Sequence, residues 1–251
     1  MSRLAEKVAI VTGGGSGIGR ASAIRFAEEG ARVVVAEIQP ELGQATADAV
    51  RSMGGEAFFC ETDVTKEQSV ADCVAEAIRR FDRLDVLLIC AGGSLPEDAP
   101  VTEVDWGVYE KTLSLDLEGT MLCCRHGIPE MVRSGGGSVI NSSSVVALQG
   151  GHPMHVYSSA KGAIISFTRA IAGTYARQGV RANAICPGVV LSDRIRARFG
   201  AEGEGTTLGE EHPFAVGEPV DIANVALFLA SEESRMITGA VIPAEGGLSS
   251  Y

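Results

Sequence analysis

Basic side chains are scarce in this chain of 251 residues. Lys and Arg number 21 against 32 Asp and Glu, so the formal net charge is -11 with His neutral. No stretch gathers the Lys and Arg that a surface following a phosphate backbone needs. We therefore expect no nucleic-acid partner, and an acidic surface is not attracted to an anionic membrane either.

Long apolar runs and patterned cysteines are also missing. The chain has no run of roughly 18 apolar residues, which a transmembrane helix requires, and MSRLAEKVAIVTGGG lacks the apolar core of a secretory signal. The six cysteines form no CxxC pair and no Cys/His group with zinc-site spacing. We therefore expect a cytoplasmic protein with buried thiols, no metal and no membrane contact.

Two patterns alternate along the chain. Seven short apolar runs have the character of strands buried on both faces of a parallel sheet. They are KVAIVT (7–12), RVVVAE (32–37), EAFFCE (56–61), DVLLIC (85–90), GSVINSS (137–143), RANAIC (181–186) and GAVIPA (239–244).

Helical periodicity fills the intervals between these runs. Apolar residues recur at three- and four-residue spacing over 18–30, 40–54 and 66–81, and Gly30 and Gly54 stand where C-terminal caps are expected. The alternation predicts an α/β fold: a single Rossmann-type, doubly wound domain over residues 1–251, with a seven-stranded, mostly parallel sheet and helices on both faces.

One irregular segment, rich in Gly and Glu, interrupts this alternation at about 192–217. Long segments without periodicity in a compact domain are often functional. We expect this segment to be a lid over a substrate site.

A glycine-rich turn follows the first predicted strand. Gly13, Gly17 and Gly19 stand at the opening of the next helix, where they allow a tight turn and the approach of a pyrophosphate to backbone N–H groups. Plain βα connections can also contain such a turn. The turn by itself therefore leaves both interpretations open.

An acidic residue at the end of the second strand favours the dinucleotide interpretation. Glu37 can accept hydrogen bonds from an adenosine ribose diol, although it could also be a solvated residue at a strand end. Neither Ser16 nor Ile38 supplies the cation that a 2′-phosphate requires. NAD(H) is therefore favoured over NADP(H).

A tyrosine and a lysine stand four residues apart at the start of a predicted helix. Tyr157 and Lys161 share one helix face, and an ammonium beside a phenol favours the phenolate, which suits general acid/base chemistry. Taken alone, the spacing equally fits a packed tyrosine and a solvated lysine. Upstream, Ser142, Ser143 and Ser144 end the fifth strand, where a hydroxyl could bind a carbonyl oxygen as it gains charge, although three serines are also typical of a turn.

Together these motifs resemble the short-chain dehydrogenase/reductase family, in the classical subtype with a TGxxxGxG loop and a YxxxK site. The matches run in order along almost the whole chain: TGGGSGIG (12–19), DV (63–64), AG (91–92), SSS (142–144), YSSAK (157–161), PG (187–188) and ITGAVIPAEGG (237–247). The resemblance implies an NAD(H)-dependent oxidoreductase that interconverts a secondary alcohol and its ketone. It also implies a homotetramer, assembled through the two long helices beside the active site.

The resemblance implies a role for each matching residue. Tyr157 would be the general acid/base, Lys161 would support it and hold the nicotinamide ribose, and Ser144 would bind the substrate oxygen. The implied cofactor site contains Gly13, Ser16, Gly17, Ile18, Gly19, Glu37, Asp63, Val64, Cys90, Ala91, Gly92, Tyr157, Lys161, Pro187, Gly188, Val190 and Ser192.

Two positions depart from the family pattern. Cys90 replaces the second asparagine of NNAG, and Asp116, in SLDLEGT, stands where a catalytic asparagine is expected to support a water in a proton relay to the lysine. An aspartate keeps the acceptor, loses the amide donor and, if ionised, favours a charged ammonium. Asp116 is therefore a fourth candidate catalytic residue, which either positions its neighbours as the asparagine does or alters the relay.

The substrate is not encoded in any motif. His152, Met154 and His155 lie between Ser144 and Tyr157 and are candidate substrate contacts, although loop histidines are mostly solvated. Two alternatives stay open: an NADPH-dependent 3-ketoacyl reductase, which Glu37 disfavours, and a catalytically impaired nucleotide-binding homologue. An enoyl reductase is disfavoured because that branch of the family separates its tyrosine and lysine more widely.

Overall fold

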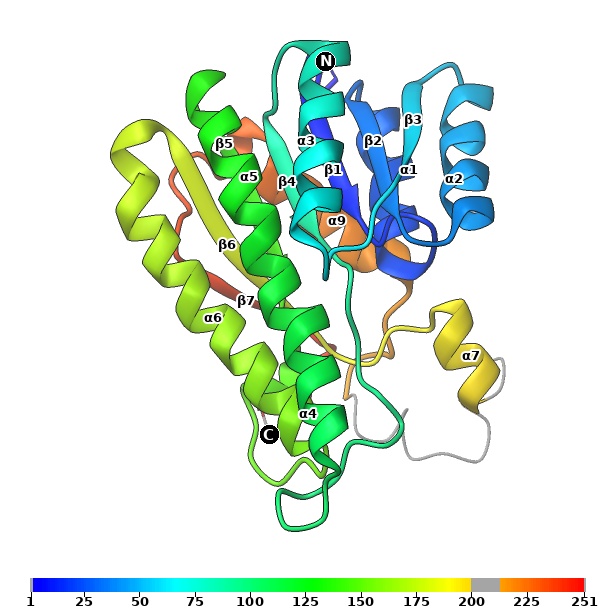
Figure 1. Ribbon diagram of the computed structural model, residues 1–251, viewed down its shortest axis with the longest axis vertical. Helices are drawn as coiled ribbons and strands as arrows, with labels where there is room; N and C mark the ends of the chain where they lie inside the picture. The colour runs from blue at the N-terminus through cyan, green and yellow to red at the C-terminus, as the bar shows by residue number, and fades with distance from the viewer. Residues whose placement is uncertain (1, 200–212, 251) are drawn as a thin grey trace.

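Seven strands form one parallel sheet in the order β3-β2-β1-β4-β5-β6-β7 (Figure 1). The computed structural model describes residues 2–199 and 213–250. The strands are β1 (Val8–Thr12), β2 (Arg32–Glu37), β3 (Glu56–Glu61), β4 (Val86–Ile89), β5 (Gly137–Ser142), β6 (Val180–Pro187) and β7 (Val241–Ala244). The strand order reverses between β1 and β4, which is where ligands bind in open sheets of this kind.

Helices cover both faces of the sheet because successive strand residues point to opposite sides. Val8 and Ile10 join the core beneath one helix layer, and Ala9 and Val11 join the core beneath the other. The first layer contains α3 (Glu67–Phe81), α5 (Gly119–Arg133) and α6 (His155–Tyr175), and the second contains α1 (Gly17–Glu28), α2 (Pro40–Ser52) and α9 (Pro219–Ala230). The predicted fold class is confirmed.

Shorter helical elements join the strands and the main helices. The helix α4 (Trp106–Thr112) runs without a break through a π-helical stretch, η1 (Leu113–Glu118), into α5. The helix α7 (Asp193–Phe199) follows β6 and lies in the segment expected to be a lid, whereas residues 200–212 of that segment are outside the described residues. Single 3-10 turns are η2 (Val145–Ala147), η3 (Ala176–Gln178), η4 (Glu232–Ser234) and η5 (Leu248–Ser250).

Local details agree with several expectations. Gly30 and Gly54 follow α1 and α2 with φ of 84° each, as C-terminal caps do. All six cysteines are free, and four of them are buried. Over 2–199 and 213–250, we find no helix with the length and apolar character needed to cross a membrane.

Candidate active site

The turn after β1 folds against the segment that follows β4. Gly13 and Gly17 have positive φ (63° and 49°), a conformation that L side chains rarely adopt. A Cβ on Gly13 would lie 2.9 Å from the Ala91 nitrogen, and a Cβ on Gly19 would collide with the Gly13 carbonyl oxygen. Glycine is therefore required at these points, and the loop backbone forms one wall of the crevice.

The N-terminus of α1 has no side-chain cap. Ser16 is the N-cap residue, but its side chain makes no capping hydrogen bond, and Ile18 packs against the core beneath α1. The first N–H groups of the helix are thus available to an anion in the crevice, as in other phosphate-binding turns.

Glu37 is buried at the end of β2, and backbone groups hold its carboxylate. Its Oε2 accepts from Gly15 N–H (3.1 Å), and its Oε1 accepts from Ile38 and Gln39 N–H (3.0 and 3.1 Å). Because a carboxylate oxygen can accept two hydrogen bonds, Oε2 keeps capacity for a hydroxyl. The next residue, Ile38, is 55% exposed, but its side chain is apolar, so this position offers no cation to a 2′-phosphate.

Asp63 and Val64 follow β3 on the same side of the crevice. Asp63 Oδ1 accepts from the Thr65 N–H (2.9 Å) and from the Thr65 hydroxyl (2.7 Å). Val64 is buried, and a Cβ on Gly119 would lie 2.9 Å from its Cγ2. This packing fixes the Asp63 and Val64 backbone beside the first turn of α5.

Cys90 lacks the side-chain amide of the family pattern, but the backbone around it is anchored. The N–H groups of Cys90 and Ala91 both donate to Thr12 Oγ1, at 3.2 Å. Burial raises the pKa of the Cys90 thiol to about 12, and nearby Lys161 opposes that rise. Cys90 is therefore a neutral packing group at neutral pH.

The three consecutive serines make three different contacts. The Ser142 carbonyl oxygen accepts from Lys161 Nζ (3.0 Å), and the Ser143 hydroxyl donates to the Lys161 carbonyl oxygen (2.8 Å). The Ser144 hydroxyl only accepts a long bond from Val146 N–H (3.4 Å), and among the described residues no acceptor takes its proton. Of the three hydroxyls, only that of Ser143 has an acceptor for its proton among the described residues, so the Ser144 hydroxyl remains able to donate a hydrogen bond.

Tyr157 and Lys161 lie one turn apart at the start of α6. Lys161 Nζ is 5.5 Å from the centre of the Tyr157 ring and 2.7 Å from Asp116 Oδ1. Burial by itself would lower the pKa of Lys161, but the charge of Asp116 and the charge of a Tyr157 phenolate raise it above the usual 10.5. The ammonium is therefore retained although the side chain is buried.

Asp116 reaches this ammonium from the π-helical stretch η1. Its side chain is fully buried, and Oδ1 also accepts from Gly93 N–H (3.0 Å). A side chain on Gly92, where φ is 139°, would collide with the same oxygen. Asp116 Oδ2 is buried without a hydrogen-bond partner within the described part of the chain. This oxygen can therefore still accept a hydrogen bond.

The end of β6 brings a further segment to the glycine loop. Gly188 N–H donates to the Ala244 carbonyl oxygen (3.1 Å), which continues the pairing with β7 beyond Pro187. Val190 pairs with Gly217 in an isolated parallel bridge. A Cβ on Gly17 would lie 3.2 Å from Ser192 Cβ, so Ser192 faces the opening of α1 across the crevice.

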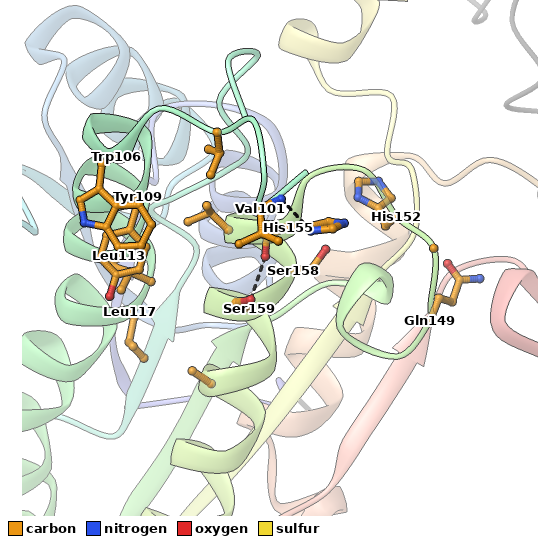
Figure 2. Close-up of a pocket in the computed structure, with 14 residues that line it drawn as sticks. Val101, Trp106, Tyr109, Leu113, Leu117, Gln149, His152, His155, Ser158 and Ser159 are labelled. Atoms are coloured by element: carbon orange, nitrogen blue, oxygen red, sulfur yellow. Dashed lines mark hydrogen bonds between the residues drawn. The ribbon is translucent and has the colours of Figure 1, made fainter. Parts of the chain in front are cut away.

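The residues His152 and His155 line a pocket of about 620 Å³ that lies outside the catalytic cluster (Figure 2). Its described lining includes the stacked rings of Trp106 and Tyr109 but not Ser144, Tyr157, Lys161 or Met154. The His155 ring turns toward Val101 and accepts its N–H at Nδ1 (3.0 Å). Met154 N–H donates to His152 Nδ1 (3.3 Å).

Asp98 is a residue of this region that has no recognisable motif in the sequence. Its carboxylate accepts from the backbone N–H groups of Val156 and Tyr157 at the start of α6. The only signal in the sequence is indirect: Met154, the residue before the helix, cannot cap it, so a cap has to come from elsewhere.

Comparison with known proteins gives consistent matches over the whole chain. A family model described as Enoyl-(Acyl carrier protein) reductase matches residues 13–249. The cis-4-hydroxycyclohexanecarboxylate dehydrogenase of Sinomonas cyclohexanicum is 36% identical over 243 residues, which are 97% of this chain and 96% of the relative.

Solved structures of short-chain dehydrogenases also superpose on almost the whole chain. A short-chain type dehydrogenase/reductase from Mycobacterium ulcerans superposes with a TM-score of 0.93 at 31% identity, covering 98% of this chain and 90% of that one. A 7 alpha-hydroxysteroid dehydrogenase, solved with NADH and 7-oxo glycochenodeoxycholic acid, has a TM-score of 0.91 at 32% identity, covering 98% and 95% of the two chains.

Proposed function

This chain belongs to the short-chain dehydrogenase/reductase family, and we propose that it is an NAD(H)-dependent oxidoreductase that interconverts a secondary alcohol and its ketone. The observation that carries this proposal is the arrangement around one ammonium. Lys161 Nζ is 2.7 Å from Asp116 Oδ1 and 5.5 Å from the centre of the Tyr157 ring. A buried cation beside a phenol stabilises the phenolate, which can take the proton of an alcohol.

Four side chains divide the proton chemistry in this proposal. Tyr157 takes the hydroxyl proton during oxidation and returns it to the carbonyl oxygen during reduction, while Ser144 donates a hydrogen bond to that oxygen. Lys161 stabilises the phenolate. Asp116 pairs with the Lys161 ammonium. Its Oδ2 can accept a hydrogen bond from the water of the proton relay, through which Tyr157 returns to its starting protonation state. A bound nicotinamide ring supplies or accepts the hydride.

The crevice fits a dinucleotide, and three observations support this. Side chains are excluded at Gly13 and Gly19, the α1 N-terminus has no side-chain cap, and the buried Glu37 carboxylate keeps an acceptor at the end of β2. We assign the diphosphate and adenosine ribose to Ser16, Gly17, Ile18 and Glu37, the adenine to Asp63 and Val64, and the adjoining backbone to Cys90, Ala91 and Gly92. The nicotinamide end is assigned to Tyr157, Lys161, Pro187, Gly188, Val190 and Ser192.

A ring-borne secondary alcohol is the substrate class to examine first. The relatives that support this choice are named for 4-hydroxycyclohexanecarboxylate and for a 7-hydroxysteroid. His152, Met154 and His155, together with a lid at about 192–217, are proposed to contact the substrate; His152 and His155 would do so from the pocket outside the catalytic cluster. The four-residue spacing of Tyr157 and Lys161 argues against the enoyl reduction in the description of the family model.

The test is a panel of oxidations and reductions followed by cofactor absorbance. Cyclic secondary alcohols are offered with NAD⁺ and with NADP⁺, and a 3-ketoacyl and an enoyl thioester are offered with NADH and NADPH. Turnover of alcohols with NAD⁺ that Tyr157→Phe abolishes is the expected result. Cofactor binding without turnover of any compound would favour a nucleotide-binding role, and a preference for NADPH and thioesters would favour the ketoacyl reductase.

We also propose that residues 1–251 act as one domain in a cytoplasmic homotetramer. The outer face formed by α5 and α6, which lie side by side in Figure 1, supports the assembly. It carries a hollow of about 770 Å³, whose mostly apolar lining includes Leu117, Met121, Leu122, Phe167 and Ile171. Met121 is 46% exposed, so Met121→Glu is expected to dissociate the assembly in analytical ultracentrifugation.

A further inference from the structure

The catalytic helix α6 begins without a cap of its own. An α-helix leaves its first backbone N–H groups without partners inside the helix, and here those groups belong to His155, Val156 and Tyr157. Met154 occupies the N-cap position and makes no side-chain hydrogen bond to the helix. The first internal bond recorded for the helix runs from Ser158 N–H to the Met154 carbonyl oxygen, at 3.0 Å.

The segment after β4 satisfies all three of these N–H groups. Asp98 Oδ2 accepts from Tyr157 N–H (2.8 Å) and its Oδ1 accepts from Val156 N–H (3.3 Å). The Ala99 carbonyl oxygen accepts from His155 N–H (3.4 Å). We call these contacts of Asp98 and Ala99 with residues 155–157 the α6 clasp.

Three further hydrogen bonds support the clasp. Asp98 N–H donates to the Leu95 carbonyl oxygen (3.1 Å), and Ala99 N–H donates to Asp98 Oδ1 (2.8 Å), so the aspartate is fixed within its own turn. Val101 N–H donates to His155 Nδ1 (3.0 Å). A carboxylate is well suited to this place, because negative charge is favoured at a helix N-terminus and charge-assisted hydrogen bonds are the stronger kind.

The clasp acts on the tyrosine more directly than on the lysine. Tyr157 lies in the clasped first turn, whereas Lys161 lies one turn later and is held separately by Asp116 and the Ser142 carbonyl oxygen. The same segment also continues from Ala91 and Gly92, beside the glycine loop. Asp98 therefore connects the position of the Tyr157 turn to the wall of the crevice.

We propose that Asp98 is a positioning residue for Tyr157, a carboxylate from outside the helix that fixes the first turn of α6 relative to the crevice. The catalytic part of this inference rests on the proposed function. Without the clasp, the first turn loses three hydrogen-bond acceptors and the phenol loses its fixed direction. A misplaced reacting group costs rate even when substrate and cofactor still bind.

The test compares Asp98→Ala with a matched variant, Asp105→Ala. Asp105 is the N-cap of the neighbouring helix α4, where its side chain accepts from Gly107 N–H (2.9 Å). Each substitution removes one capping carboxylate, so both are expected to lower Tm by roughly 2–4 °C. Only Asp98→Ala is expected to lower kcat, by about 10- to 100-fold, with the Kd for NAD⁺ unchanged. Asp98→Asn keeps one acceptor and is expected to recover part of that loss.

Hydrogen exchange provides a readout that does not need turnover. Peptides covering residues 152–160 are expected to exchange faster in Asp98→Ala than in Asp105→Ala or the wild type, while the rest of α6 exchanges as before. Unchanged exchange at the first turn would overturn the clasp. Faster exchange with a kcat within twofold of the wild type would overturn the positioning role. If the wild type turns over no alcohol at all, the proposed function fails and the exchange experiment still decides on the clasp.

Discussion

Lys161 Nζ lies 2.7 Å from Asp116 Oδ1, and both side chains are buried. The ammonium comes from the catalytic helix and the carboxylate from a π-helical stretch, a rare conformation that often occurs at functional sites. Leaving a buried charge without its partner is costly. The pair therefore holds the two elements together where the family pattern has a neutral amide.

Asp116→Asn is expected to make the enzyme lose activity at a lower alkaline pH than the wild type. The raised pKa of Lys161 means that its ammonium, and the stability it contributes, persists below about pH 10.5 and is lost as pH rises through the higher folded value. Without the carboxylate, burial dominates and lowers the Lys161 pKa, so the proton leaves at lower pH. A pH profile of kcat/KM measures this as an alkaline limb that moves to lower pH, with activity near pH 7 kept within about tenfold.

Asp105→Asn is the control for this profile, because it also removes one carboxylate, but one that does not contact the Lys161 ammonium. Its alkaline limb is expected to coincide with that of the wild type. An Asp116→Asn profile that also coincides would mean that the carboxylate does not govern the charge of Lys161.

The three serines are expected to respond differently to alanine. Ser142→Ala keeps the carbonyl oxygen that binds Lys161, so little change is expected. Ser143→Ala removes the bond to the Lys161 carbonyl oxygen and should lower the free energy of unfolding by about 1–3 kcal/mol. Ser144→Ala should lower kcat by about 10²- to 10³-fold with stability preserved. Urea unfolding and steady-state kinetics on all three variants separate these effects, and equal losses of kcat would refute the distinction.

Replacing Glu37 at the end of β2 is expected to shift the cofactor preference from NAD⁺ toward NADP⁺. Glu37→Ser with Ile38→Arg removes the charge that repels a 2′-phosphate and adds a cation at an exposed position. We expect the ratio of kcat/KM for NADP⁺ to that for NAD⁺ to rise by more than about tenfold, which corresponds to about 1.4 kcal/mol.

Ile38→Ala is the control for the cofactor exchange, since it leaves the Glu37 contacts with Gly15 and Gln39 in place. It should preserve the preference for NAD⁺. A wild-type enzyme that already prefers NADP⁺ would contradict the proposed role of Glu37.

Local patterns were sufficient to predict most of the fold. The strands β2 and β3 have the predicted bounds, because their apolar runs begin and end at charged residues. The strand β7 starts at Val241, two residues after its predicted start, since Gly239 has φ of 74° and belongs to a turn. The strand β4 ends at Ile89, one residue before its predicted end, although the Cys90 N–H still donates to the Thr12 carbonyl oxygen (3.3 Å) as well as to its hydroxyl (3.2 Å).

The details of the site depend on contacts that no local pattern carries. The sequence predicted Glu37 as an acceptor but not the three backbone N–H groups that already bind it. It predicted that Asp116 stands near the lysine but not the π-helical stretch that delivers it. Asp98 was not predicted, because its partners in α6 are more than fifty positions away in the chain and the contact is made through backbone groups.

The central claim is that Tyr157 transfers the substrate proton beside a bound nicotinamide cofactor. The most direct measurement is NADH formation from a cyclic secondary alcohol by the wild type and by Tyr157→Phe, with the Kd for NAD⁺ measured for both. The expected result is turnover by the wild type, a loss of at least about 10²-fold in kcat for Tyr157→Phe, and similar Kd values. A Tyr157→Phe enzyme that binds NAD⁺ and turns over at the wild-type rate would contradict the claim.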